Sequence, residues 1–150
     1  MNHYSAIVIA WSCAAKTILI VLEKAQRMIL KIICFKRYDF STSELYKMTG
    51  VLTVRQLFVL STVLKQHGCS HLRITHYLKR RRKDQVFTTP STSLSFGQKH
   101  STFLGPRVYN KINSILNVSE DSDYKCKTKV SKFLQDLSYQ DTENLLLSPN

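Results

Sequence analysis

The feature that most constrains the fold is the helical spacing of apolar residues in two long segments, residues 14–35 and 53–66. Apolar residues that recur every three or four positions predict amphipathic helices, each with one face to bury. In the first segment these positions are Ile18, Val21, Leu22, Ala25, Met28, Ile29, Ile32 and Ile33. In the second, after a capping Thr53, they are Val54, Leu57, Phe58, Leu60, Val63 and Leu64. We expect residues 14–66 to hold most of the core, so that loss of the C-terminal helix is better tolerated.

Caps and helix breakers predict further helices. Residues 41–44, Ser-Thr-Ser-Glu, suit the start of a short helix that runs through Met48 and ends at Gly50. Gly68 is expected to end the helix of residues 53–66. Pro106 suits the first position of the next helix, in which Val108, Tyr109, Ile112, Ile115 and Leu116 line one face. A last helix, residues 124–137, has an apolar side and a lysine side: Val130, Phe133, Leu134 and Leu137 against Lys125, Lys129 and Lys132.

The remaining segments are less regular. Residues 84–102 are rich in Ser and Thr and predict loops, with a small hairpin between residues 86–88 and 101–103. Residues 138–150 are expected to be disordered. The fold class is therefore mainly α: a small helical bundle with a short extended or loop segment and a C-terminal helix. We divide the chain into a helical core (1–78), a basic linker with a helix (79–118), and an acidic linker with a terminal helix and tail (119–150).

Positive charge is concentrated in the first 119 residues. The chain carries 22 Lys and Arg against 10 Asp and Glu, a net charge of +12. Residues 120–150 hold six of the acids and four lysines, so the first 119 residues have 18 basic and 4 acidic groups. Such a field favours phosphate-bearing partners or anionic surfaces, although a basic and inert surface is also compatible with it.

A run of five cations is the best candidate for contact with nucleic acid. It can neutralise several phosphates, although a solvated turn or a nuclear localisation signal would look the same. The candidate nucleic-acid-binding residues are Lys79, Arg80, Arg81, Arg82, Lys83, Lys99, Arg107 and Lys111. Aromatic residues that could stack on bases are Phe87, Phe96, Phe103 and Tyr109, of which the last two fit the core better.

Catalysis by this chain is not expected. Two-metal phosphoryl transfer needs clustered carboxylates, and the chain has no Asp-Asp pair. The four acids of the first 119 residues are scattered: Glu23, Asp39, Glu44 and Asp84. We predict no catalytic residue, no metal site and no cofactor. A zinc site could be assembled only from residues with unusual spacing, namely Cys69, His71, His76 and Cys126.

The N-terminus and the cysteines bear on the compartment. Residues 3–11 predict a short apolar helix, and a signal peptide cleaved near Ala15 would fit residues 6–22. However, no Lys or Arg precedes that stretch, and Lys16 interrupts it before it could span a membrane. The four cysteines are far apart, which favours reduced thiols. We expect an intracellular protein, nuclear or cytoplasmic, without a membrane partner.

Several motifs in a fixed order resemble a known polymerase region. Tyr4 and Trp11 lie in an apolar helix before a Lys-containing amphipathic helix marked by Ile18, Leu22, Gln26, Leu30 and Ile33. Residues 44–64 continue with a short helix, Gly50, Leu52 and a longer helix. Residues 95–98, Ser-Phe-Gly-Gln, precede residues 104–111, Leu-Gly-Pro-Arg-Val-Tyr-Asn-Lys. Together, over about residues 2–137, they resemble the thumb and C-terminal tail of a non-LTR (LINE-type, jockey- or RTE-like) retrotransposon reverse transcriptase.

The resemblance implies a thumb-like helical bundle that grips RNA or an RNA–DNA duplex, followed by an RNA-binding tail. The parent would be an RNA-directed DNA polymerase that uses Mg²⁺, and its palm, fingers and endonuclease domains would be partners missing from this chain. Ser12 in place of the usual Gly, and the acidic tail, depart from the pattern. The start at Met1, just inside the expected thumb, suggests a fragment, a decayed copy, or a gene model truncated at its first in-frame Met. Two alternatives remain: an orphan or domesticated interaction module using Leu57 and Phe58, and a small secreted or membrane-anchored basic protein.

Overall fold

The computed structural model describes residues 16–70, 87 and 101–147, and these form six helices. Their order is α2 (Lys16–Ile33), α3 (Thr42–Thr49), α4 (Val54–Ser70), α6 (Ser101–Leu116), α7 (Asp123–Asp136) and α8 (Tyr139–Leu147). Within the described residues there is no strand, and the predicted mainly α fold is confirmed. The predicted elements at residues 3–11 and 86–88 lie wholly or largely outside the described residues.

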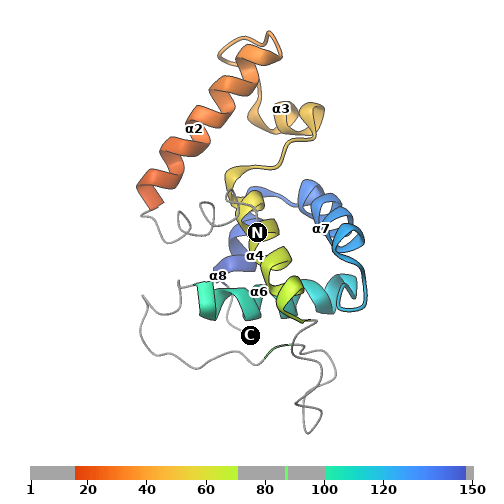
Figure 1. Cartoon of the computed structure of the whole chain (residues 1–150). Coiled ribbons are helices and arrows are strands. Elements are labelled where there is room, and N and C mark those ends of the chain that lie inside the picture. The colour runs from red at the N-terminus through yellow and green to blue at the C-terminus, as the bar shows by residue number, and fades with distance from the viewer. Residues whose placement is uncertain (1–15, 71–86, 88–100, 148–150) are drawn as a thin grey trace, which may run out of the picture.

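Helix α4 is the centre of the bundle, and α6, α7 and α8 pack around it (Figure 1). The predicted cap at Thr53 is confirmed, because Gln56 N donates to Thr53 Oγ1 at 3.2 Å. Gln56 completes a capping box, since Thr53 N donates to Gln56 Oε1 at 2.9 Å. The prediction that Gly68 ends this helix is wrong, because α4 continues to Ser70. A glycine inside a helix costs only about 1 kcal/mol, which the packing of α4 outweighs.

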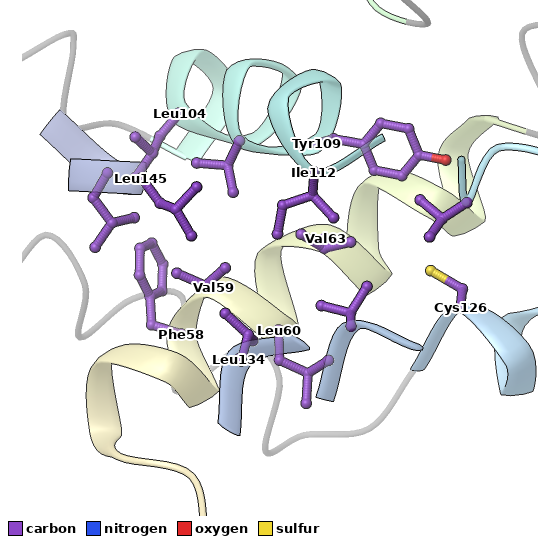
Figure 2. Close-up of a cluster of buried hydrophobic side chains, with 14 of the residues drawn as sticks. Phe58, Val59, Leu60, Val63, Leu104, Tyr109, Ile112, Cys126, Leu134 and Leu145 are labelled. Carbon is purple, nitrogen blue, oxygen red and sulfur yellow. The ribbon is translucent and has the colours of Figure 1, made fainter. Parts of the chain in front are cut away.

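One hydrophobic cluster forms the core between these four helices (Figure 2). Val59 and Val63 of α4 face Ile112 of α6 and Leu134 of α7, and all four are fully buried. The cluster also draws on each of the three segments into which the sequence was divided. Its members are Leu52, Phe58, Val59, Leu60, Val63, Phe87, Leu104, Val108, Tyr109, Ile112, Val118, Cys126, Val130, Leu134, Leu145 and Leu146.

Residues 139–147 form a helix that joins this core, so the prediction that residues 138–150 are disordered is wrong for them. Helix α8 starts at Ser138, whose Oγ accepts from Asp141 N at 3.2 Å and donates to Asp141 Oδ2 at 2.6 Å. Its far end buries Leu145 and Leu146 against the cluster. A cap at the start and two apolar anchors at the end therefore fix this helix.

Helix α6 starts earlier than the sequence predicts. It begins at Ser101, so residues 101–103 are helical and cannot form one strand of a hairpin. Pro106 lies inside the helix and not at its first position. Most of the predicted apolar face is confirmed, because Val108, Tyr109 and Ile112 are fully buried, but Ile115 is exposed.

Two buried polar side chains at the edge of the core, His67 and Asn110, form hydrogen bonds within the fold. His67 of α4 is fully buried: its Nδ1 lies 2.9 Å from the Tyr109 hydroxyl and its Nε2 lies 2.8 Å from the Asp121 carbonyl oxygen. The Asn110 side chain clamps the backbone of Phe87, accepting from its N at 2.9 Å and donating to its O at 2.7 Å. The Phe87 ring then meets the Tyr109 ring edge-on at 5.1 Å.

Helix α2 extends away from the other helices, so its predicted role as a core helix is wrong (Figure 1). Leu19 is buried, but the predicted apolar face is open to solvent, with Ile32 70% exposed. The exposed members of that face are Val21, Leu22, Ala25, Met28, Ile29, Ile32 and Ile33. Among the described helices, none combines the length and apolar character needed to cross a membrane.

Candidate nucleic-acid interface

Six of the eight predicted nucleic-acid-binding residues, Lys79 to Lys83 and Lys99, lie outside the described residues. The other two are on α6 and contact the last turn of α8. The Arg107 guanidinium donates to the Leu146 carbonyl, and Lys111 Nζ donates to the Asn144 carbonyl at 3.3 Å. Cations at a helix C-terminus satisfy free carbonyls and offset the helix dipole.

Burial lowers the pKa of both of these cations. It lowers the pKa of Arg107, and burial followed by the nearby Arg107 charge lowers the pKa of Lys111. The Arg107 guanidinium also lies 5.7 Å from the centroid of the Phe103 ring. A phosphate that bound here would compete with the α8 carbonyls. The two residues remain candidates for phosphate contact, and they have a structural role as well.

A second cluster of cations and aromatic rings lies where α2 ends. We call residues 31–40 the basic-aromatic corner. Helix α2 closes with two backbone bonds, Lys36 N to Lys31 O at 2.8 Å and Phe35 N to Ile32 O at 3.1 Å. This pair of bonds is a Schellman motif, which requires a residue in the left-handed region. Phe35 occupies that position with φ of 52°.

The aromatic side chains of the corner differ in exposure. Phe35 is 96% exposed and Tyr38 is 85% exposed, whereas Phe40 is half-buried. Large aromatic rings normally contribute to stability through burial. The fold therefore gains little from the rings of Phe35 and Tyr38, and both are open to a partner.

Cations accompany these rings. Lys31 Nζ donates to the Tyr38 carbonyl at 2.5 Å and lies 5.5 Å from the centroid of the Tyr38 ring. Lys36 Nζ lies 5.0 Å from the centroid of the Phe40 ring. Arg37 Nε is 3.5 Å from Asp39 Oδ1, but both side chains are solvent-exposed, so this ion pair is weak. The corner thus presents rings and positive charge together.

Further cations continue along α2. Lys24, Arg27 and Lys31 are spaced by three and four residues, so they share one side of the helix, beside the exposed apolar face. The one acid of this helix, Glu23, faces the body instead: its Oε1 lies 3.6 Å from Arg55 Nε. The solvent-facing charge of α2 is consequently positive.

The orientation of α2 depends on polar contacts. Arg55 of α4 lies between Glu23 and Glu143 of α8, with its Nη1 2.9 Å from Glu143 Oε1. Gln26 Nε2 donates to the Leu52 carbonyl at 2.9 Å and Gln26 Oε1 accepts from the Tyr46 hydroxyl at 3.0 Å. These contacts set the direction in which α2 carries the basic-aromatic corner.

The pKa of the Glu23 carboxyl is raised at this contact. Burial raises its pKa above the usual 4.5, Arg55 opposes the rise, and the Glu143 charge adds to it. Two carboxylates share one guanidinium here, so both depend on Arg55 for charge compensation. This arrangement is an ion-pair network that joins α2, α4 and α8.

Sequence reasoning missed the corner although its signal is present. Residues 35–40 read Phe-Lys-Arg-Tyr-Asp-Phe, an alternation of aromatic and charged residues. The rings of Phe35, Tyr38 and Phe40 were not among the candidate stacking residues, and Lys36 and Arg37 were not among the candidate cations. Two residues that were considered for base stacking are buried instead. Phe87 lies in the core and is not available to a base, and the prediction that Tyr109 is a core residue is confirmed.

The structure describes two members of the zinc set considered above, Cys69 and Cys126. Cys126 is buried, and burial, with Asp121 and Asp123, raises its pKa to about 11. Cys69 is exposed. His71 and His76, the other members of the zinc set considered above, lie outside the described residues. Among the described residues, no three Cys, His, Asp or Glu side chains come together as metal ligands.

Comparison with known proteins supplies no relative. The chain matches no protein-family model, no curated protein and no solved structure. The function must therefore be inferred from the residues and their arrangement.

Proposed function

We propose that this chain binds nucleic acid, RNA or an RNA–DNA duplex, and does not itself catalyse a reaction. The observation that carries the proposal is the net charge of +12, with the positive charge gathered in the first 119 residues. The motif order described above supports a narrower version: a thumb and tail of a non-LTR retrotransposon reverse transcriptase. In that version Mg²⁺ and polymerase activity belong to the parent's palm, and the chain acts inside the cell, in the nucleus or the cytoplasm.

Two regions would supply phosphate contacts. The run Lys79–Lys83 offers five adjacent cations, and the α2 side with Lys24, Arg27 and Lys31 offers three more on one helix. Each phosphate neutralised on duplex DNA adds about 0.9 to the slope of log K against log salt. Four or five contacts therefore give a slope of about −4.

The test compares two variants, each of which lacks three positive charges of a single segment. Arg80→Ala, Arg81→Ala and Arg82→Ala are combined in one variant, and Lys125→Ala, Lys129→Ala and Lys132→Ala form the matched control. The control lysines are exposed on α7, and Lys129 already pairs with Asp121 at 2.6 Å. Affinity for a fluorescent RNA–DNA duplex is measured over a range of salt concentrations.

The proposal expects the arginine variant to flatten the slope by about 2 to 3, since each lost contact removes about 0.9. The lysine control should retain most of the original slope. Equal loss in both variants would mean that binding follows total charge and is not localised to the run. An unchanged slope in the arginine variant would remove the run from the interface.

A second candidate function is a helical protein-interaction module. The surface that supports it is the exposed apolar face of α2, not the expected pair Leu57 and Phe58. Phe58 is buried in the core and is not available to a partner, while Leu57 is partly exposed. The exposed apolar face of α2 offers a larger surface, with Ile29, Ile32 and Ile33 each more than half exposed. Apolar patches on this scale mark interaction sites. Partner binding through this face would survive high salt, which separates it from binding to phosphates.

A further inference from the structure

One residue of the basic-aromatic corner is in an unfavourable backbone conformation. Among the described residues, three have positive φ near helix ends: Phe35, Gly50 and Asn117. Gly and Asn are the residues that tolerate this conformation. A bulky side chain there places Cβ too close to the backbone, so Phe35 is strained where glycine would not be.

Within the described part of the chain, no packing contact of the Phe35 side chain offsets the free-energy cost of this strain. The ring of Phe35 is 96% exposed, so it gains almost no burial. The Schellman motif around it needs only the backbone, which glycine would supply better. Local strain that packing does not explain is a reason to look for a function in the side chain itself.

Phe35 has the neighbours that a stacking site needs. Tyr38 follows three residues later and is 85% exposed, and Lys31 lies over its ring and holds its carbonyl. Lys36 and Arg37 lie between the two aromatics in the chain, and Asp39 is the acid nearest to them. Sites for single strands combine aromatic faces for bases with cations for the backbone.

We propose that the basic-aromatic corner binds unpaired bases of single-stranded nucleic acid. Phe35 and Tyr38 stack on bases, and Lys36 and Arg37 contact the flanking phosphates. Paired bases inside a duplex do not offer their faces, so the ligand is a single strand, a loop or a frayed end. This inference rests on the proposed function but adds a site and a ligand class to it.

An anionic lipid surface would also attract rings and cations. The position of Lys31 favours bases over lipid as the ligand of Tyr38. The Lys31 ammonium group lies over the Tyr38 ring, so a ring that inserted into the lipid would carry this charge into the apolar layer. A base can instead stack on the other face of a ring that Lys31 holds in place. Lipid binding is accordingly one of the outcomes that the test separates.

The experiment uses the full chain and three single variants: Phe35→Gly, Tyr38→Ala and the control Tyr124→Ala. Tyr124 is an exposed aromatic residue on α7, next to Lys125, so the control removes a similar ring beside a cation. Each protein is titrated by fluorescence anisotropy against a single strand of about 12 uridines, within the site sizes of single-strand binders. The same RNA–DNA duplex as above and vesicles of anionic lipid are titrated in parallel, and thermal unfolding is recorded.

The inference expects Phe35→Gly and Tyr38→Ala each to weaken single-strand binding about fivefold or more, the low end for loss of one stacked base. Duplex binding should stay near the original, and Tyr124→Ala should change neither. Phe35→Gly should keep or raise the melting temperature, because glycine fits the left-handed position. A residue with a purely structural role would not give this combination of an equal or higher melting temperature and a lower affinity for the single strand.

Other outcomes overturn the inference in distinguishable ways. Unchanged single-strand affinity in both variants, with duplex binding intact, removes the corner as a site and leaves the proposed function standing. Absence of binding to both single strand and duplex by the original chain refutes the proposed function itself. Loss of vesicle binding with no change in single-strand affinity would assign the corner to a lipid surface.

Discussion

Truncation of one buried and one exposed residue tests the packing of the bundle. Leu134 lies on α7 against α4, is fully buried, and its carbonyl accepts from Gln56 Nε2 at 2.5 Å. Ile32 lies on α2 and is 70% exposed. From sequence periodicity both residues belong to apolar helix faces, so the two substitutions separate what the structure adds from what the pattern alone predicts.

The expected costs differ widely. Leu134→Ala loses the transfer free energy of its buried side chain and leaves a cavity, which together cost about 2–5 kcal/mol. Ile32→Ala removes atoms that are already in water, and surface substitutions of this kind stay within about 0.5 kcal/mol. A domain of ordinary stability has about 5–15 kcal/mol in total. Leu134→Ala should therefore shift the unfolding midpoint strongly, and Ile32→Ala hardly at all.

Urea unfolding followed by circular dichroism measures both free energies of unfolding in the same buffer. Equal slopes for the variants would show that the midpoint shift reflects stability. A cost for Ile32→Ala that matches the cost for Leu134→Ala would contradict the structure. It would mean that the apolar face of α2 is buried in the folded monomer, as sequence periodicity predicts.

Three further predictions concern buried polar and titratable groups. Asn110→Ala removes both bonds to the Phe87 backbone and should destabilise the chain by about 1–3 kcal/mol in urea unfolding, whereas no change would refute the clamp. Cys126 is buried with a pKa of about 11, so mass-spectrometric mapping of thiol labelling at neutral pH should find the exposed Cys69 modified in the folded chain and Cys126 only on unfolding. Burial raises the pKa of Glu23 above 4.5, so its contribution to stability is present at low pH and is lost as pH rises through the raised value. Urea unfolding at several pH values should thus show a smaller loss of stability between about pH 4 and pH 7 in Glu23→Gln than in the original chain, and an identical profile would contradict the raised pKa.

Sequence patterns predicted most helices of this fold because their signals are local. The pair Thr53 and Gln56, and the break at Gly50, are short-range features that fix helix ends wherever they occur. The same logic would have found α8, since Ser138 with Asp141 is a capping pair ahead of Leu145 and Leu146. That helix was missed because a polar C-terminus was taken as a tail.

Periodicity could not tell which helix faces meet. The residues of α2 and α4 show the same kind of apolar stripe, yet only the α4 stripe is enclosed, by three helices that follow it in the chain. An apolar face predicts that a helix buries one side, but it does not identify the element that covers that side. The left-handed backbone at Phe35 could not be predicted either, because the sequence pattern of the corner shows its rings and cations but not its backbone conformation.

The most direct measurement is the salt dependence of binding by the unaltered chain. A fluorescent RNA–DNA duplex is titrated at several salt concentrations, and log K is plotted against log salt. The proposed function predicts measurable affinity at low salt and a slope of about −4, from four or five neutralised phosphates. Absence of binding at low salt, or an affinity that does not change with salt, would contradict it.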